Sequence, residues 1–457
     1  MCKRIFMAVA VAFVVFVGTA QAKQPKNIGL SVLSTYENGV FDEGAAEIVA
    51  YDPATQGLFV INADAKTVDI LDISDPTNPT LYDTIVVSSI KDSGGINSVA
   101  VRDGLVAVAV EHKDKQSNGW AAFYNTDGSY INHVGAGPLP DMVTITHNGN
   151  YALVANEGEP SGDYANDPEG SITVIDLRNG AANATTMTAV FTGFNEAPPA
   201  GVRYSIPTPT TTFAQDMEPE YIATSQNSRT AWVTLQENNA IAIVDIPSAT
   251  VTNVVGLGNK DHSLSLNGLD ASNEDDAINI TSWPVLGTYM PDAIAAYRTR
   301  GRTYLVTANE GDAREYAYDA SEEDCLDAGH VYDDGVCFSW VDETRVKDVT
   351  LDPSVFMDDT LQEKPKLGRL KMLTTEGNTD GDDEYEEIHA FGARSISIWD
   401  VGVSLVADTG DTIERETAIA LPDDFNYDDL PDHLLDAPVN AARSHTGGGP
   451  PCAAQEG

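Results

Sequence analysis

Basic residues are scarce in this chain. Its 457 residues include 26 lysines and arginines against 70 aspartates and glutamates, which gives a formal net charge of −44. Such a charge repels nucleic acid and anionic membrane surfaces and attracts divalent cations or basic partners. We therefore exclude nucleic acid as a partner. The simplest alternative reading is that the acidity only keeps the protein soluble.

Apolar runs long enough to span a bilayer are also missing. The run over residues 5–18 is shorter than the roughly 20 residues that a membrane helix needs. It follows Lys3 and Arg4 and precedes Ala20-Gln21-Ala22, which is the order of a secretory signal peptide. We predict that residues 1–22 are removed and that no membrane-spanning segment remains after cleavage. The protein is then exported, either periplasmic, at the cell surface or secreted; a retained anchor is the alternative.

Cysteines are few, and one of the four, Cys2, lies in the predicted signal peptide. Cys325 and Cys337 bracket a short glycine-containing segment, and in an oxidising compartment this spacing predicts a disulfide that closes a surface loop. A zinc site is the alternative, but only His330 is near and there is no second cysteine pair. Cys452 is left over.

Helical periodicity is nearly absent, which excludes a parallel α/β sheet with amphipathic crossover helices. Short strands rich in β-branched residues recur instead, for example at residues 58–64, 151–157, 231–237 and 304–310. Glycine, asparagine and aspartate turns separate them, as in blades of short antiparallel strands. The repetition favours a radial array over a sandwich. We predict an all-β fold, a β-propeller of the seven-bladed type with six blades legible and the last blade apparently missing.

The repeat also suggests boundaries. We expect the propeller over residues 23–436, interrupted by an insertion at residues 311–386, and an aberrant unstructured tail at residues 437–457. A polar linker is expected at residues 256–291. The sixth legible blade is interpreted from residues 388–400.

Acidic residues recur at fixed places in the repeat. The first strands begin at Glu47, Asp141, Glu220 and Asp292, with Asn97 in the second blade, and the second strands end at Asp64, Glu111, Glu157, Glu237 and Glu310. Because neighbouring strands are antiparallel, these residues should share one face of the disc, where Arg394 takes the equivalent place in the sixth blade. The side chains can accept hydrogen bonds from turn amides, a purely structural role. Alternatively, they hold a divalent metal and present it to a ligand or partner.

One loop has the spacing of a calcium site. Aligned on Gly381, oxygen donors fall at positions 1, 3, 5, 7, 9 and 12 of a twelve-residue loop: Glu376, Asn378, Asp380, Asp382, Glu384 and Glu387. This is EF-hand spacing, with glycine at position six and glutamate at position twelve. Position one departs from the pattern because it is glutamate, and flanking helices are not evident. We predict Ca²⁺ as cofactor; a solvated acidic turn is the alternative.

Familiar catalytic signatures are missing. The sequence has no Gly-x-Ser-x-Gly, no His-Glu-x-x-His, no phosphate-binding loop and no dinucleotide fingerprint. The histidines are scattered singly near strands, and no nucleophile stands out. Catalysis is therefore left uncertain.

Several segments, taken in order, resemble the choice-of-anchor I family: Ala-Asn-Glu-Gly-Glu-Pro (155–160), Gln-Asp-Met-Glu-Pro-Glu-Tyr-Ile-Ala (215–223), Tyr-Met-Pro-Asp-Ala-Ile (289–294) and Thr-Ala-Asn-Glu-Gly-Asp-Ala-Arg (307–314). The resemblance implies an exported bacterial propeller held at the cell surface, and some members carry the label alkaline phosphatase. We expect the protein to be a binding module whose acidic face, stabilised by calcium, binds an unknown ligand or cell-surface partner. The alternative is a calcium-dependent phosphoester hydrolase in which Asp141, Glu157, Glu237 and Glu310 hold metal and Arg314 or Arg394 steadies the phosphate.

Overall fold

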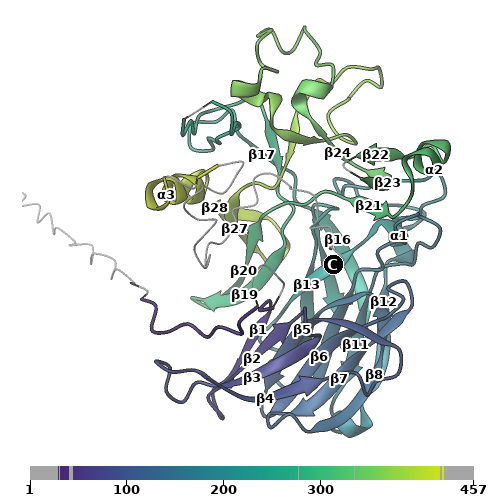
Figure 1. Cartoon of the computed structure of the whole chain (residues 1–457), viewed down its shortest axis with the longest axis vertical. Helices are drawn as coiled ribbons and strands as arrows, with labels where there is room; N and C mark the ends of the chain where they lie inside the picture. Colours follow the sequence, from purple (N-terminus) through teal and green to yellow (C-terminus); the bar gives the residue numbers. More distant parts are fainter. Residues whose placement is uncertain are drawn as a thin grey trace, which may run out of the picture.

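The computed structural model describes residues 29, 31–40, 45–275, 277–333, 335–422 and 425–426. The predicted signal peptide, the predicted tail and Cys452 lie outside these residues. Within them the chain forms five four-stranded antiparallel blades and, at one end of the array, a cap made of two further sheets (Figure 1).

The first four blades each use four consecutive strands. Blade 1 holds β1 (Val49–Asp52), β2 (Gly57–Asn62), β3 (Thr67–Asp72) and β4 (Thr80–Val86). Blade 2 holds β5 (Ser93–Arg102), β6 (Leu105–His112), β7 (Asn118–Asn125) and β8 (Tyr130–Pro138). Blade 3 holds β9 (Pro140–Ile145), β10 (Tyr151–Asn156), β11 (Ser171–Asp176) and β12 (Thr185–Val190). Blade 4 holds β13 (Pro219–Thr224), β14 (Thr230–Leu235), β15 (Ala240–Asp245) and β16 (Thr250–Gly256).

The fifth blade is split by the insertion. Its strands are β19 (Ala293–Thr299), β20 (Arg302–Asn309), β27 (Ser395–Asp400) and β28 (Leu405–Asp408). The prediction of a sixth legible blade at residues 388–400 is wrong, because β27 pairs along its whole length with β20. The chain leaves at Gly311 and returns at Gly392, where the two backbones pass so closely that a Cβ on either glycine would collide with the other strand.

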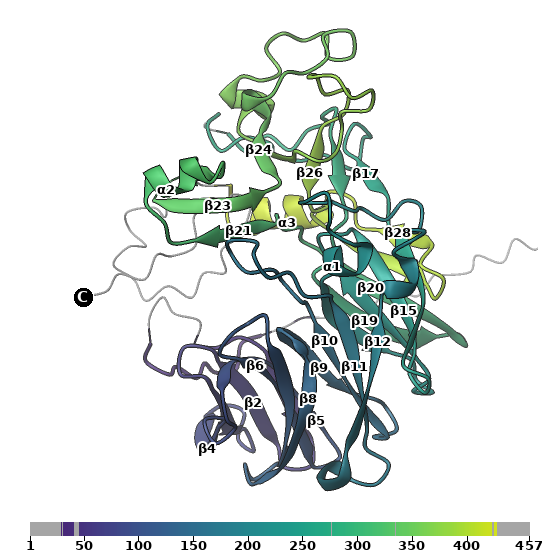
Figure 2. The same ribbon diagram turned by 90° about the vertical axis from the view of Figure 1, so that its right-hand side faces the viewer.

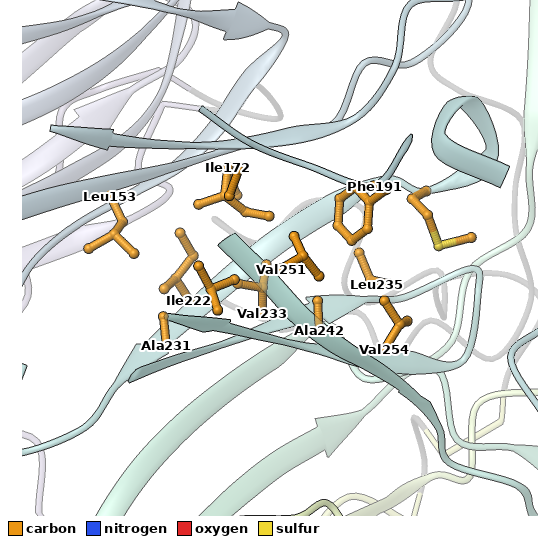
Figure 3. Packing of buried hydrophobic residues seen from close by; sticks show 14 of the residues in the cluster. Leu153, Ile172, Phe191, Ile222, Ala231, Val233, Leu235, Ala242, Val251 and Val254 are labelled. Atoms are coloured by element: carbon orange, nitrogen blue, oxygen red, sulfur yellow. The ribbon is translucent and has the colours of Figure 1, made fainter. Parts of the chain in front are cut away.

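Successive side chains of a strand point to opposite sides of the sheet, and in the inner blades the side chains on both sides are apolar. One face of blade 3 packs on blade 4 in the largest core cluster, with Leu153 and Ile172 against Val233 and Ala242, all fully buried (Figure 3). Each buried Val, Leu or Ile of this kind stabilises the fold by roughly 1.5–3 kcal/mol through burial. Separate clusters join blades 1 and 2, blades 2 and 3, and blades 4 and 5. Four blade-to-blade cores, taken in chain order, therefore hold the array together.

The cap combines the insertion with residues that precede blade 5. A five-stranded mixed sheet contains β17 (Asn259–Asp261), β18 (Leu286–Thr288), β24 (Glu343–Arg345), β25 (Lys371–Leu373) and β26 (His389–Phe391). Its core unites Leu269 and Val285 with Leu367 and Met372, which are far apart in sequence. The prediction of a polar linker at residues 256–291 is therefore wrong: this segment supplies two strands and part of the core of the cap.

The second cap sheet is a small lobe beside blades 3 and 4, visible in both overall views (Figures 1 and 2). It holds β21 (Glu315–Tyr318), β22 (Val331–Asp333), β23 (Val336–Val341) and the helix α2 (Glu322–Asp327). Cys325 and Cys337 form the predicted disulfide within this lobe. Two other short helices are α1 (Phe213–Asp216), just before blade 4, and α3 (Thr412–Ala420), after blade 5.

Among the described residues, no helix is both long and apolar enough to cross a membrane.

Candidate functional site

Strand pairing brings the predicted acids of a blade together at one end of its strands. In blade 3 the Glu157 amide donates to the Leu139 carbonyl at 3.0 Å, which sets Glu157 beside Asp141. In blade 4, Pro219 pairs with Leu235, so Glu220 and Glu237 lie at the same end of the two strands.

In blade 5 the Asp292 amide donates to the Ala308 carbonyl at 3.1 Å, two residues before Glu310. The corresponding strand ends are therefore acidic in three consecutive blades, blades 3, 4 and 5.

Five of these carboxyl groups act on one another electrostatically: Asp141, Glu157, Glu220, Glu237 and Asp292, which we call the carboxylate cluster. Each is only partly accessible. Burial raises the pKa of Asp141 to about 7, and the negative charges of Asp292 and Glu237 act in the same direction. Burial, with the neighbouring acids, also raises the pKa of Glu157 and Glu220 well above the ordinary value. The cluster therefore holds more negative charge than the protein around it compensates.

Glu237 lies at the centre of this imbalance. Burial raises its pKa to about 7, although the nearby Arg314 opposes the rise. Its Oε2 atom is buried and has no hydrogen-bond partner among the described residues. A buried carboxylate oxygen without a donor is costly unless a proton or a cation satisfies it.

Glu220 has one neutral neighbour. When the Gln236 amide is oriented with its nitrogen toward Glu220, it donates to the two carboxylate oxygens at 3.0 and 3.2 Å. An amide supplies hydrogen bonds but no positive charge, so it leaves the repulsion within the cluster in place.

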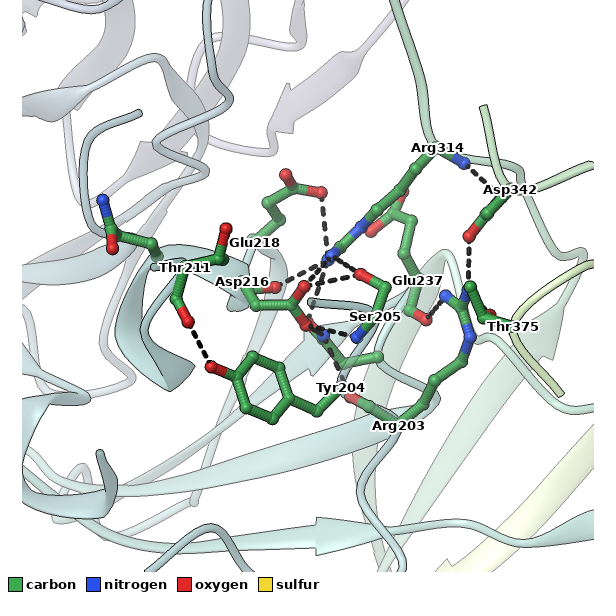
Figure 4. Close-up of polar contacts among 12 residues, drawn as sticks. Arg203, Tyr204, Ser205, Thr211, Asp216, Glu218, Glu237, Arg314, Asp342 and Thr375 are labelled. Atoms are coloured by element: carbon green, nitrogen blue, oxygen red, sulfur yellow. Dashed lines mark hydrogen bonds and ion pairs between the residues drawn. The ribbon is translucent and has the colours of Figure 1, made fainter. Parts of the chain in front are cut away.

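A buried ionic network forms one wall of the cluster (Figure 4). Arg314, from the start of the insertion, donates from Nη1 to Asp216 Oδ1 at 2.6 Å and to Ser205 Oγ at 2.7 Å. Its Nη2 lies 3.2 Å from Glu218 Oε2, and the Tyr316 hydroxyl donates to Glu218 Oε1 at 2.7 Å. Burial raises the pKa of Glu218 to about 8 even beside this arginine.

Local structure places Asp216 for this role. Thr212 and Gln215 form a capping box at the start of α1, in which the Thr212 side chain accepts from the Gln215 amide and the Gln215 side chain accepts from the Thr212 amide. The single turn of helix ends at Asp216, whose Oδ2 accepts from Asn238 Nδ2 at 2.7 Å.

A second arginine ties the cap to the same wall. Arg203 donates from Nη1 to the Glu237 carbonyl at 2.6 Å and pairs through Nη2 with Asp342 of the cap. Asp342 also accepts from the Arg314 amide at 3.0 Å. The insertion is thus fastened to the propeller directly beside the cluster.

The other acids predicted on this face are either exposed or accept a hydrogen bond from a backbone amide. Glu47 and Asp64 of blade 1 are exposed. Glu111 accepts from the Gly95 amide at 2.7 Å, the structural role weighed above for such acids. Glu310 is exposed, and its charge contributes to the raised pKa of Asp292.

Arg394 does not occupy an equivalent place, because residue 395 begins the third strand of a blade rather than the first. It pairs with Glu414 of α3 at 3.0 Å and donates to the Asp270 carbonyl at 3.1 Å.

The acidic loop at residues 376–387 brings together only part of its predicted ligand set. Carboxylate oxygens of Asp380, Asp382 and Glu386 lie within 4.8 Å of one another. Glu376 faces Arg203 with 3.9 Å between the charged atoms, and Glu387 bonds His389 at 2.8 Å.

The other two predicted ligands of this loop make local contacts. Asn378 Oδ1 accepts from the Gly381 amide at 2.7 Å, and the Glu384 amide donates to Asp382. Glu386, which the spacing argument did not include, also accepts from the Thr379 amide and hydroxyl.

Sequence reasoning missed Asp216 and Glu218 as neighbours of the cluster. Asp216 ends the helix α1 and Glu218 precedes β13, so strand alternation could not link them to Glu220. Tyr316 and Arg203 also carried no sequence signal, because Tyr316 lies in the cap and Arg203 in the long connection between β12 and β13.

The geometry suits a hard cation. Carboxyl groups from three blades raise one another's pKa, the buried Glu237 Oε2 has no partner among the described residues, and the arginines nearby are already engaged with Asp216, Glu218 and Asp342. Such an oxygen-only donor set is the kind that Ca²⁺ and related divalent cations prefer.

Comparison with known proteins gives a family and a set of remote structural likenesses. The family model of the choice-of-anchor I domain matches residues 47–448. No curated protein shows significant similarity to the chain.

Solved structures that resemble the chain do so remotely. The β-propeller domain of Cps50 (Swd1) from Myceliophteria thermophila is 11% identical, with 80% of this chain and 87% of that chain covered and a TM-score of 0.34. A functionally unknown protein from Desulfotomaculum acetoxidans is 10% identical, with 83% and 90% covered and a TM-score of 0.37. A protein from Lactobacillus plantarum is 14% identical, with 61% and 68% covered and a TM-score of 0.38.

Proposed function

The chain belongs to the choice-of-anchor I family, and from this premise we propose that it is an exported binding module. Its carboxylate cluster holds a divalent cation, with Ca²⁺ as the first candidate, and the cation binds oxygen atoms of a polar or anionic ligand or surface partner. Family membership supports export, whereas the compartment and the cation are our inference.

One observation carries the proposal: five neighbouring carboxyl groups from blades 3, 4 and 5 have raised pKa values, and a buried Glu237 oxygen lacks a donor among the described residues. A purely structural role would satisfy these oxygens with amides, as Glu111 is satisfied by Gly95. A cation removes the repulsion between the acids and fills the missing coordination at once.

The hydrolase alternative needs a further positive group to hold phosphate. Arg314 is buried and bound to Asp216 and Glu218, while Arg394 is paired with Glu414. Neither guanidinium is available without breaking its ion pair. The arrangement therefore supports cation and ligand binding over phosphoester hydrolysis.

The test is titration calorimetry of the chain from Lys23 onward with CaCl₂, after removal of divalent cations by chelation. We expect binding to be lost in the variant Glu157→Gln/Glu237→Gln, because the substitutions remove two charges from the cluster while keeping side-chain volume. The variant Asp380→Asn/Asp382→Asn separates any contribution of the acidic loop.

The matched control is Glu47→Gln/Asp64→Asn, which removes two acids from the corresponding edge of blade 1, where both are exposed. It should bind as the unmodified chain does. Unchanged affinity and stoichiometry in Glu157→Gln/Glu237→Gln, with a normal circular dichroism spectrum, would rule out the cluster as the cation site.

A further inference from the structure

A polar groove lies between blades 2 and 3. Its volume is about 350 Å³, at the small end of the range for ligand sites in proteins. One wall is the end of β8, which contains Gly135 and Gly137, and the other wall is formed by β11 and β12 (Figure 1). Hydroxyl side chains line this second wall: Ser171, Thr173, Thr186 and Thr188. We call this feature the hydroxyl groove.

Two of these hydroxyl groups are buried and held by Asn156. Ser171 is 5% exposed and Thr173 is 2% exposed. Asn156 Oδ1 accepts from the Gly137 amide at 2.9 Å, while Nδ2 donates to Ser171 Oγ at 3.3 Å and to Thr173 Oγ1 at 3.0 Å. A Cβ on Gly137 would lie 2.8 Å from Ser171 Oγ, so a larger residue there would displace the hydroxyl.

Each of the two hydroxyl groups therefore accepts a hydrogen bond and still has its own proton to donate. Neither finds an acceptor for that proton among the described residues, and both groups line the groove.

Blade 5 contains the same arrangement with the acceptor in place. Asn309 Nδ2 donates to Ser395 Oγ at 3.0 Å and to Ser397 Oγ at 2.7 Å, from the same register positions that Asn156 uses in blade 3. Both serine hydroxyls then donate to Asp408 Oδ2, at 2.7 and 2.6 Å. One carboxylate oxygen of the fourth strand thus takes both protons.

Blade 3 has the donors of this arrangement but not the carboxylate. Thr188 pairs with Thr173 as Asp408 pairs with Ser397, so a threonine stands where blade 5 has its acceptor. In the described structure the Thr188 side chain accepts from neither hydroxyl. A ligand oxygen at this place in the groove would complete the bonds that Asp408 completes in blade 5.

Blade 4 shows that blade packing does not require polar groups at these positions. Leu235, Ala240 and Ala242 occupy the same register there, and all are fully buried in an apolar core with Phe191. Burying polar groups costs free energy unless their hydrogen bonds are completed. The two hydroxyl groups of blade 3 are therefore better explained by a ligand than by packing.

Charge around the groove identifies the kind of oxygen that fits. In blade 5 the Lys260 ammonium lies 3.5 Å from Asp408 Oδ1 and compensates the carboxylate. Among the described residues that line the hydroxyl groove there is no lysine or arginine, and the charged one is Glu169. An anionic ligand group would be repelled, whereas a neutral oxygen would not. Glu169 and Asn118 can in turn accept hydrogen bonds from the ligand.

We propose that the hydroxyl groove binds a neutral saccharide unit. One sugar oxygen accepts from Ser171 and Thr173, and other sugar hydroxyls donate to Glu169 and Asn118. A sugar suits both sets of partners because each of its hydroxyl groups donates and accepts. The site needs no cation and shares no residue with the carboxylate cluster, so it is independent of the function proposed above.

The experiment measures binding of the chain from Lys23 onward to an array of immobilised neutral and uronate-bearing oligosaccharides, in the presence of a chelator. Two groove variants are compared. Ser171→Ala/Thr173→Val removes both donors, and Thr188→Asp places an acceptor where blade 5 has Asp408, so that it occupies the site of the ligand oxygen.

Each groove variant has a matched control. Ser395→Ala/Ser397→Ala removes the corresponding hydroxyl groups from blade 5. Thr185→Asp adds the same charge as Thr188→Asp at an exposed position of β12 that points to the opposite side of the sheet. A melting curve of every variant checks that it is folded.

We expect neutral oligosaccharides to bind the unmodified chain and both controls, and binding to fall by about tenfold in each groove variant, since two hydrogen bonds are lost. Absence of binding to any neutral oligosaccharide overturns the proposal, and so does binding that persists in both folded groove variants. A preference for uronate-bearing sugars contradicts a neutral ligand. Binding that appears only when Ca²⁺ replaces the chelator would place the sugar at the carboxylate cluster instead.

Discussion

At the scale of single residues, the carboxylate cluster makes stability depend on pH in an unusual direction. Burial raises the pKa of Asp141 and Glu237 to about 7, whereas an unfolded carboxyl titrates near pH 4. Between these limits the folded state binds more protons than the unfolded state, so stability falls as pH rises. Without divalent cations, we expect the melting temperature to decrease from pH 5 to pH 8.

The measurement is thermal denaturation across that pH range in the presence of a chelator. Asp141→Asn/Glu237→Gln should flatten the decrease, and Glu47→Gln/Asp64→Asn should leave it unchanged. Added Ca²⁺ should raise the melting temperature most at the alkaline end, where the acids are ionised. A melting temperature that climbs steadily with pH in chelator would contradict the assignment of raised pKa values.

Arg314 gives a second prediction at this scale. It is buried and neutralises Asp216 and Glu218, so Arg314→Met leaves two acids unpaired. Removing one partner of a buried pair typically lowers the free energy of unfolding by about 3–5 kcal/mol. The comparison is Arg178→Met, which breaks an exposed pair with Asp176 and should lower the free energy of unfolding far less. Denaturant titration measures both, and equal losses would show that the Arg314 network contributes no more than a surface pair.

Sequence reasoning reached part of this site. Strand-end acids were predicted at their positions because antiparallel pairing alone dictates which ends share an edge. The sequence could not predict which of these acids become buried, since burial depends on neighbours in other blades and on the cap. Asp64 and Glu157 hold the same place in the repeat, yet Asp64 is exposed and Glu157 is largely buried.

At the scale of elements, the strands of blades 1 to 4 were largely predicted from alternating β-branched residues. Blade 5 was not, because local pattern carries no information on which strands pair across an insertion. The strand Ser395–Asp400 has the pattern of a new repeat, but β20 lacks a third-strand partner until this segment returns. Two segments interpreted as linker and insertion likewise form one cap, since their pairing is nonlocal.

The disulfide lobe offers a prediction for an element. Cys325 and Cys337 are 12 residues apart, and closing a loop of about this length stabilises by roughly 3 kcal/mol in the chain-entropy model. In Cys325→Ser/Cys337→Ser we expect faster hydrogen exchange in α2, β22 and β23, with blade strands β10 and β14 unaffected. Exchange that is unchanged in the lobe would show that its strand pairing alone maintains it.

At the scale of the whole molecule, the net charge of −44 opposes folding. Like charges lie closer together in the folded chain than in the unfolded chain, so their repulsion lowers the free energy of unfolding. Salt screens this repulsion, with a Debye length of about 8 Å at physiological ionic strength. We therefore expect the melting temperature in chelator to rise with sodium chloride, measured by thermal denaturation at fixed pH. Calcium chloride at the same ionic strength should raise it further, and the variant Glu157→Gln/Glu237→Gln should lose only that additional rise. A melting temperature that does not change with salt would contradict the view that repulsion across the whole molecule limits stability.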